Sequence, residues 1–476
     1  MAAMTDTAQK RTFVLELNEV NLNLLSDLVT AGRLPAFNRL FQTHRLVPTL
    51  AREPYGKLEP WIQWVSAHSG LDQAGHGAFN LTDAQHADFD QVWDLLEDAG
   101  IPCGIVSPMN ARRGRLKRGF FLPDPWSAER DVWPEELAPV DRFISERVNN
   151  HNINLERGSS KIAFAQTCLD IGIPPRALAR LAWHYLRSRV DPATKWRLAA
   201  QFDRFVVEAT LAMMRRRPVR HVSVFLNAVA HYQHHYWSRH NPGRWSRVAP
   251  GLFRHVNPLE KSNLKVEDDP VAYGFAVYDR ILARVRQAAP DARILVVTAL
   301  SQVPFEGYEG GRGFFLYRPY EHERLFETLG LGATRVVPLM SRDVMLYFAD
   351  DAERARAVAR LAAFRVGDEP VFAWTEEKGS RLFVKVAYTF AADATTRIER
   401  ADGPPLVFED WFKLITFKTG HHHPQGFVLC PPEMMPAADR FVDGLLPVER
   451  VFDMILDAHG VQAPERAPQP AALKAS

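Results

Sequence analysis

The sequence TFVLELNEV, residues 12–20, gives the first indication of the fold. Thr12 to Leu17 has the length and the apolar content of a short buried strand. A helical pattern follows from Asn21 to Leu40, with breaks at Gly32 and Pro35. A buried strand that leads directly into a helix is typical of an α/β domain with a parallel sheet, and we predict that class of fold.

The same alternation recurs farther along the chain. Gln91 to Ala99 is amphipathic and precedes an apolar strand at Ile101 to Val106. Two more buried strands are expected at His221 to Leu226 and Arg293 to Thr298, the second after a helix at Val271 to Ala288. Because these strands are spread over most of the 476 residues, we predict one discontinuous α/β domain with insertions.

Two insertions are predicted between the core segments. Residues 151–220 have helical periodicity and many arginines, including Arg215 to Arg217. We interpret these arginines as a solvated helical face rather than a polyanion site, because the total charge is balanced. Residues 335–400 have the pattern of a small α+β cap. The core is expected at 12–150, 221–315 and 406–464, and a Pro/Ala-rich disordered tail at 465–476.

The composition excludes several classes of protein. With 58 Lys+Arg against 56 Asp+Glu, the net charge of +2 gives no argument for a nucleic-acid-binding protein. Three cysteines are too few for a disulfide framework or a cysteine-based zinc ribbon. We find no signal peptide and no transmembrane segment, and therefore expect a soluble, cytoplasmic protein. The oligomeric state stays open.

Histidine is the one unusual residue type. Eight of the 17 histidines fall within residues 221–240 and 421–423. If the first cluster is helical, His231 and His234 share one face, while His235 pairs with His231 one turn away. Imidazoles from two distant segments suit zinc or another divalent metal. The alternative is that each cluster is a partly exposed polar segment that hydrogen-bonds the backbone.

Several motifs, in order, resemble those of the alkaline phosphatase superfamily, in its type I phosphodiesterase/nucleotide pyrophosphatase-like branch. Asn18-Glu19 stands where that family ends its first strand with Asp-Gly, and Gly32 to Leu40 is similar to its GxLPNxxxL segment. Pro60 to Gly70 resembles its nucleophile loop. Ala230 to Trp237 resembles its DxxQHxxW motif, and Gly420 to Gly426 its GxHxPxG motif.

This resemblance spans residues 12–107, 221–302 and 410–464, about half of the chain. It implies a three-layer sandwich with a mostly parallel sheet, to which the sequence pattern adds the helical insertion and the small α+β cap. It also implies two metal ions and a Ser or Thr nucleophile. Several positions that would supply these groups carry other residues here: Asn18, Pro60, Ala230 and the segment Thr298 to Gln302. Of the usual ligands, His234 and His422 remain.

We therefore predict a site rebuilt around one divalent ion, with zinc as the expected metal. His231 would replace the lost helix carboxylate beside His234 and His422, and Asn18 would be a weak ligand. Three histidines with an open water position are a workable catalytic zinc site.

Two glutamates and two tryptophans complete the predicted site. Glu19 or Glu59 is a candidate general base, although Glu59 could instead cap a helix and Glu19 could satisfy backbone N–H groups at a helix start. Trp61 and Trp64 are candidates for stacking against a sugar or a base, with core packing as the alternative.

The resulting hypothesis is a divergent hydrolase or transferase of that superfamily. It would act on a phosphate or sulfate ester of a small molecule, glycan or lipid, with no nucleic acid partner. The alternative is a non-catalytic relative that serves in binding or regulation.

Overall fold

The computed structural model describes residues 10–54, 57–127, 129–148, 161–240, 268–305, 315–338, 342–377 and 379–464. The tail predicted at 465–476 lies outside the described residues, as do residues 151–160 at the start of the predicted helical insertion.

An eight-stranded sheet forms the centre of the molecule, in the order β20-β2-β19-β6-β1-β5-β3-β4. Seven strands run parallel and β19 alone runs antiparallel, between β2 and β6. The predicted α/β class, with a mostly parallel sheet, is therefore confirmed. The strands are β1 (Thr12–Leu17), β2 (Arg45–Leu50), β3 (Cys103–Val106), β4 (Gly119–Leu122), β5 (His221–Leu226), β6 (Arg293–Thr298), β19 (Gln425–Cys430) and β20 (Leu446–Pro447).

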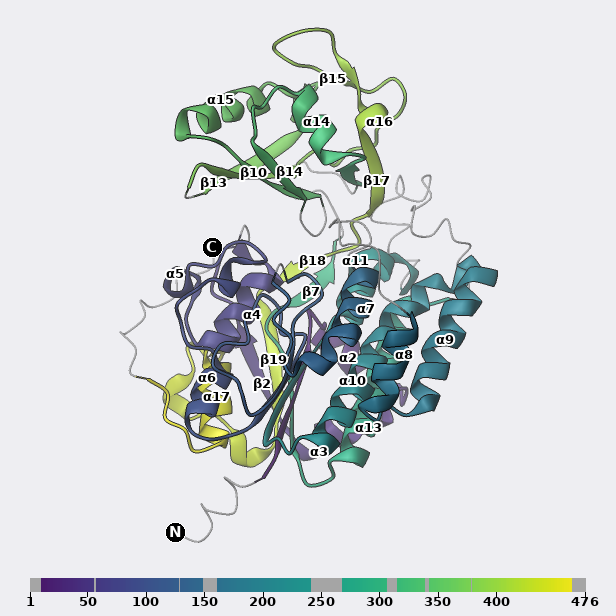
Figure 1. Cartoon of the computed structure of the whole chain (residues 1–476), viewed down its shortest axis with the longest axis vertical. Coiled ribbons are helices and arrows are strands. Elements are labelled where there is room, and N and C mark those ends of the chain that lie inside the picture. Colours follow the sequence, from purple (N-terminus) through teal and green to yellow (C-terminus); the bar gives the residue numbers. More distant parts are fainter. Residues whose placement is uncertain are drawn as a thin grey trace.

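Helices cover both faces of the sheet, which gives the core three layers (Figure 1). The helical layer on one face contains α2 (Leu22–Thr30), α3 (Pro35–Thr43), α7 (Ala138–Val148), α8 (Lys161–Asp170), α9 (Pro175–Val190), α10 (Leu198–Arg216), α11 (Ala228–His240) and α13 (Pro270–Ala288), and these helices share one apolar cluster with that face. The other face packs against α4 (Pro60–Ser69), α6 (Val92–Asp98) and α17 (Arg450–Ala458). Along β1, Phe13 and Leu15 enter the first layer and Val14 the second, as strand geometry requires.

A separate antiparallel sheet, in the order β13-β14-β10-β9, forms the cap. Figure 1 shows the cap beyond the ribbon of β7 and β18, at one end of the central sheet. Its apolar cluster draws on residues from Tyr317 to Phe412. β7 (Ser301–Pro304) and β18 (Gly420–His423) form a two-stranded ribbon of their own. The elements between them include β8 (Phe315–Pro319), α14 (His322–Thr328), β9 (Arg335–Pro338), β10 (Asp343–Tyr347), α15 (Asp351–Ala362), β13 (Phe372–Glu377), β14 (Arg381–Val386) and β17 (Phe412–Phe417).

The cap touches the core through an edge-to-face contact between Phe79 and Phe383, whose ring centroids lie 5.9 Å apart. Among the described helices, none has the length and apolar content needed to cross a membrane.

Candidate functional site

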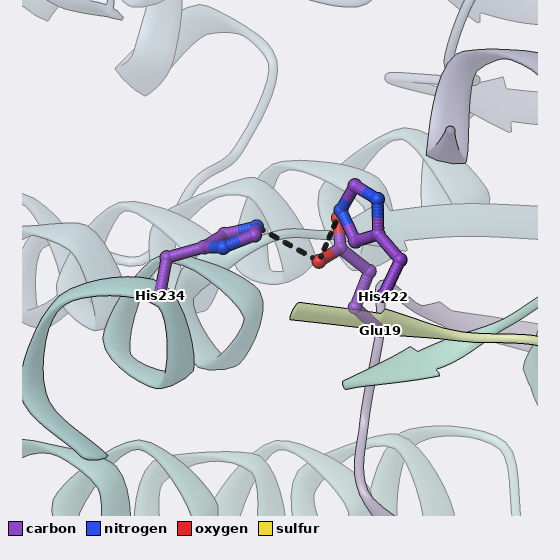
Figure 2. A group of neighbouring side chains, drawn as sticks. All are labelled: Glu19, His234 and His422. Carbon is purple, nitrogen blue, oxygen red and sulfur yellow. Dashed lines mark ion pairs between the residues drawn. The ribbon is translucent and has the colours of Figure 1, made fainter. Parts of the chain in front are cut away.

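Three side chains from distant parts of the chain meet near the end of β1. Glu19 follows β1, His234 lies on α11 and His422 on β18; Figure 2 shows both rings beside the carboxylate. Glu19 Oε2 lies 2.9 Å from His234 Nε2 and 3.3 Å from His422 Nε2. One ligand atom from each residue lies within 4.8 Å of the other two. The two histidine clusters thus supply one residue each to a single group.

The backbone of Glu19 is held in an unusual conformation. Its φ of 55° is in the left-handed region, which costs a non-glycine residue roughly 1–2 kcal/mol. Gln233 Nε2 donates a hydrogen bond to the Glu19 carbonyl at 2.6 Å, and the Gln302 backbone N–H donates to the same oxygen at 3.2 Å. The start of α2 is capped by Asn21, which accepts from the Leu24 N–H at 2.8 Å. The Glu19 side chain is therefore left to face the histidines.

Glu19 is 2% exposed, so its carboxylate is shielded from solvent. Asn18 Nδ2 donates to its Oε1 at 2.9 Å, and Gln302 Nε2 donates to its Oε2. Burial acts to raise the pKa of Glu19, but the electrostatic interactions with His234 and His422 outweigh burial and hold the pKa well below its usual range.

His422 lies between two carboxylates. Its Nδ1 is 3.4 Å from Glu59 Oε2, while its Nε2 faces Glu19. Burial acts to lower the pKa of His422, yet Glu19 and Glu59 together raise it to about 9. The buried Nε2 is within ion-pair distance of Glu19 but makes no hydrogen bond that meets the usual geometry with any described residue. Glu59 precedes α4, but its side chain does not cap that helix.

His422 reaches this position because the histidine-rich segment forms a strand. β18 pairs antiparallel with β7, with His422 opposite Gln302 and His423 opposite Ser301. Successive side chains of a strand point to opposite faces, so the neighbours of His422 cannot point the same way.

Two neutral amides, Asn18 and Gln302, lie beside Glu19, and Asn18 stands where the resemblance implied an acidic ligand. Asn18 accepts from Trp64 Nε1 at 2.9 Å and donates to Asn227 Oδ1 at 2.8 Å. Gln302 Nε2 also donates to the Ala230 carbonyl at 3.1 Å. The amide groups of Asn18 and Gln302 thus hold Glu19 in place. The sequence marked Gln302 only as a substituted position, so its hydrogen bond to Glu19 was not anticipated.

His231, predicted as a metal ligand, is not part of the group formed by Glu19, His234 and His422. Its ring stacks edge-on against His235 one turn away, with centroids 4.6 Å apart. Burial lowers the pKa of His231 to about 4, so the ring is neutral at ordinary pH.

The two tryptophans differ in their surroundings. Trp64 is 1% exposed, contacts Phe225 edge-on at 5.5 Å, and presents no free ring face. Trp61 is partly buried, and its Nε1 donates to the Phe79 carbonyl at 3.0 Å.

The cap brings further charge towards Glu59. Asp343, at the start of β10, is close enough to Glu59 for their charges to interact. Burial, with a contribution from Glu59, raises the pKa of Asp343 to about 6, while Arg342, Lys385 and Arg318 oppose this rise. The base of the cap therefore adds both acidic and basic groups beside the site.

No protein family matches the sequence, and no curated protein matches it. The structure matches phosphonoacetate hydrolase from Sinorhizobium meliloti 1021 in complex with phosphonoacetate, at 16% identity and a TM-score of 0.46, over 95% of this chain and 96% of that one. Murine ectonucleotide pyrophosphatase/phosphodiesterase 5 matches at 8% identity and a TM-score of 0.42, over 97% and 98%.

A magnesium-bound variant of TAB5 alkaline phosphatase also matches, at 9% identity and a TM-score of 0.37, over 96% of this chain and 100% of that one. At these identities the likeness concerns the path of the chain alone.

Proposed function

We propose that the protein is a divergent member of the alkaline phosphatase superfamily that acts on a phosphate or sulfate ester. The observation that carries the proposal is the convergence of Glu19, His234 and His422, which would hold one divalent metal ion. In this arrangement Glu19 takes the ligand position that the sequence assigned to His231.

The donor set fits zinc. Two imidazole nitrogens and one carboxylate oxygen are the ligands of a common type of catalytic zinc site. Zinc–ligand bonds of 2.0–2.1 Å in a tetrahedron place ligand atoms about 3.3 Å apart. The two distances from Glu19 Oε2 to the histidine nitrogens, 2.9 and 3.3 Å, are close to that value. A bound ion would supply a Lewis acid and lower the pKa of a bound water towards neutrality.

The surrounding residues would orient this group and move protons. Glu59 would hold His422 through Nδ1, as outer carboxylates do for ligating histidines. With Glu19 engaged as a ligand, Glu59 is the remaining candidate for a general base. The cations Arg318, Arg342 and Lys385 near Asp343 are suited to attract an anionic ester.

A second candidate function is binding without catalysis. Glu19 already forms ion pairs with both histidines, which compensates its buried charge without a metal. Pro60, at the nucleophile position implied by the resemblance, has no hydroxyl group. These two observations favour a relative that has kept the fold and lost its reaction.

Metal content separates the two candidates. We expect the purified protein to hold close to one zinc or manganese ion per chain, and the variants His234→Ala and His422→Ala to lose it. His423→Ala is the matched control, because this histidine is the next residue on the same strand and does not belong to the group formed by Glu19, His234 and His422.

Saturating metal at about 100 times the dissociation constant should stabilise the wild type by roughly 2.7 kcal/mol, measured by denaturant unfolding. A wild type with no metal and no stabilisation by added zinc or manganese would exclude the metalloenzyme and leave the binding protein. If metal binds, hydrolysis of p-nitrophenyl phosphate, bis-p-nitrophenyl phosphate and p-nitrophenyl sulfate then distinguishes the ester class.

A further inference from the structure

Exposed apolar side chains gather on α8 and α9, two consecutive helices that contribute no residue to the candidate site. Large hydrophobic residues are exposed at nine described positions, and five of these lie on α8 and α9. On α9, Trp183 is 61% exposed, Leu186 60% and Val190 88%. On α8, Ile162 and Leu169 are also exposed. Single exposed hydrophobic residues need no explanation, but a concentration of this kind marks an interaction surface.

The exposed residues of α9 form a stripe opposite its core face. Ala177, Leu181 and Ser188 are the buried residues of the helix. With 3.6 residues per turn, their mean direction is roughly half a turn away from that of Trp183, Leu186 and Val190. Core packing therefore explains one face of α9 and leaves the second apolar stripe without a function in the fold.

Arginines border this stripe. Arg176 and Arg187 lie on one side of it and Arg189 on the other, given 100° per residue. The side chains of these three arginines make no hydrogen bond or ion pair with any residue that the structure describes. Residues 161–197 contain seven Lys or Arg and two Asp or Glu, although the whole chain is nearly balanced at 58 against 56. The local charge of this region is therefore clearly positive.

We propose that α9 docks on the surface of a bilayer that contains anionic phospholipid. Helices that lie in the membrane interface combine an apolar stripe containing Trp and Leu with flanking Lys or Arg. Trp favours the headgroup region, and each basic residue adds attraction to anionic lipid. Figure 1 shows α9 at the periphery of the helical layer, away from the sheet. Charge complementarity favours lipid over a second copy of the chain, because two copies of this basic face would repel each other.

Vesicle co-sedimentation of the full-length protein tests this proposal. We expect the wild type to pellet with phosphatidylcholine vesicles that contain phosphatidylglycerol and to remain in solution with phosphatidylcholine alone. Trp183→Ser should weaken binding by roughly tenfold or more, because most of its ring is available to the lipid. Arg187→Gln and Arg189→Gln should each weaken it by about fivefold, and added salt should weaken it further.

The control is Tyr320→Ser. Tyr320 is an aromatic residue that is 55% exposed and does not lie on α9. The proposal is overturned if the wild type does not bind anionic vesicles, or if Trp183→Ser binds as well as the control. It is equally overturned if light scattering shows a dimer that Trp183→Ser dissociates without vesicles, because the stripe would then be an interface between copies. Circular dichroism confirms that each variant is folded.

Discussion

Glu19 is the one carboxylate of the candidate site that lies within ion-pair distance of both His234 and His422, among the described residues. The resemblance would place a glycine at this position, after an acidic residue, and the left-handed φ of 55° is a conformation that glycine adopts without cost. Here the acidic group stands one position later, on the left-handed residue itself. Strained conformations of this kind are retained mainly at functional sites.

The first prediction concerns the titration of His422. Replacing Glu19 by Gln removes the carboxylate that most strongly raises the pKa of His422, so the midpoint should fall from about 9 by roughly one pH unit or more. The measurement is an NMR titration of the histidine ring protons in metal-free protein. In Glu59→Gln the midpoint should also fall, but less. An unchanged midpoint in Glu19→Gln would contradict the ion pair between Glu19 and His422.

The sequence identified both histidines that reach the site and also Glu19 and Glu59. It could not assign their contacts, because the direction of the Glu19 side chain depends on a backbone angle set by hydrogen bonds from Gln233 and Gln302. His231 illustrates the same limit: a helical position alone does not distinguish contact with His235 from contact with a shared ion.

Among the elements, apolar patterns predicted four of the central strands, β1, β3, β5 and β6, but not β2 or β4. β1, β5 and β6 have the expected bounds, and α13 begins one residue earlier than expected. Local patterns were less informative for β18, because a histidine-rich segment becomes a strand only by pairing with β7, more than a hundred residues away. Long-range pairing of this kind leaves no periodic signal.

The start of α3 yields a second prediction. Its N-cap residue, Leu34, has no capping side chain, and Asp279 of α13 accepts from the Ala36 and Phe37 N–H groups at 2.8 and 2.9 Å instead. We expect Asp279→Ala to destabilise the protein by about 2 kcal/mol, because it leaves two buried donors unsatisfied.

Asp279→Asn keeps one acceptor oxygen, so it should lower the free energy of unfolding clearly less than Asp279→Ala does. Urea unfolding of both variants measures the difference. Equal losses would show that the charge of Asp279, and not its role as an acceptor, stabilises α3.

For the molecule as a whole, a buried histidine pair predicts how stability depends on pH. His221, at the start of β5, and His459, after α17, are 0% and 5% exposed, and His459 Nε2 lies 3.3 Å from His221 Nδ1. Burial first, and then nearby positive groups, lower the pKa of His221 to about 3 and that of His459 to about 2.

In the unfolded chain both rings titrate near pH 6.5, so below that pH the unfolded state binds more protons than the folded state. Stability therefore falls as the pH drops from about 6.5 towards 3, by about 1.4 kcal/mol per pH unit for each ring. His459→Gln should remove the contribution of one ring, so the free energy of unfolding should depend on pH less steeply by about 1.4 kcal/mol per pH unit. Urea unfolding between about pH 4.5 and 6.5 measures it, with exposed His86→Gln as the control. An unchanged slope in His459→Gln would mean that the pair is not neutral in the folded protein.

The position of β19 in the central sheet bears on how the protein is made. β2 pairs only with β19 and β20 among the described strands, and both come from the last part of the chain. A nascent chain emerges from its N-terminus, so β2 lacks its described partner strands until Gln425 and the residues after it have been made. His422 is made in the same late segment, whereas Glu19 is made at the outset. A chain released before residue 422 would thus lack one of the three proposed ligands, and the proposed site can be completed only after that residue has been made.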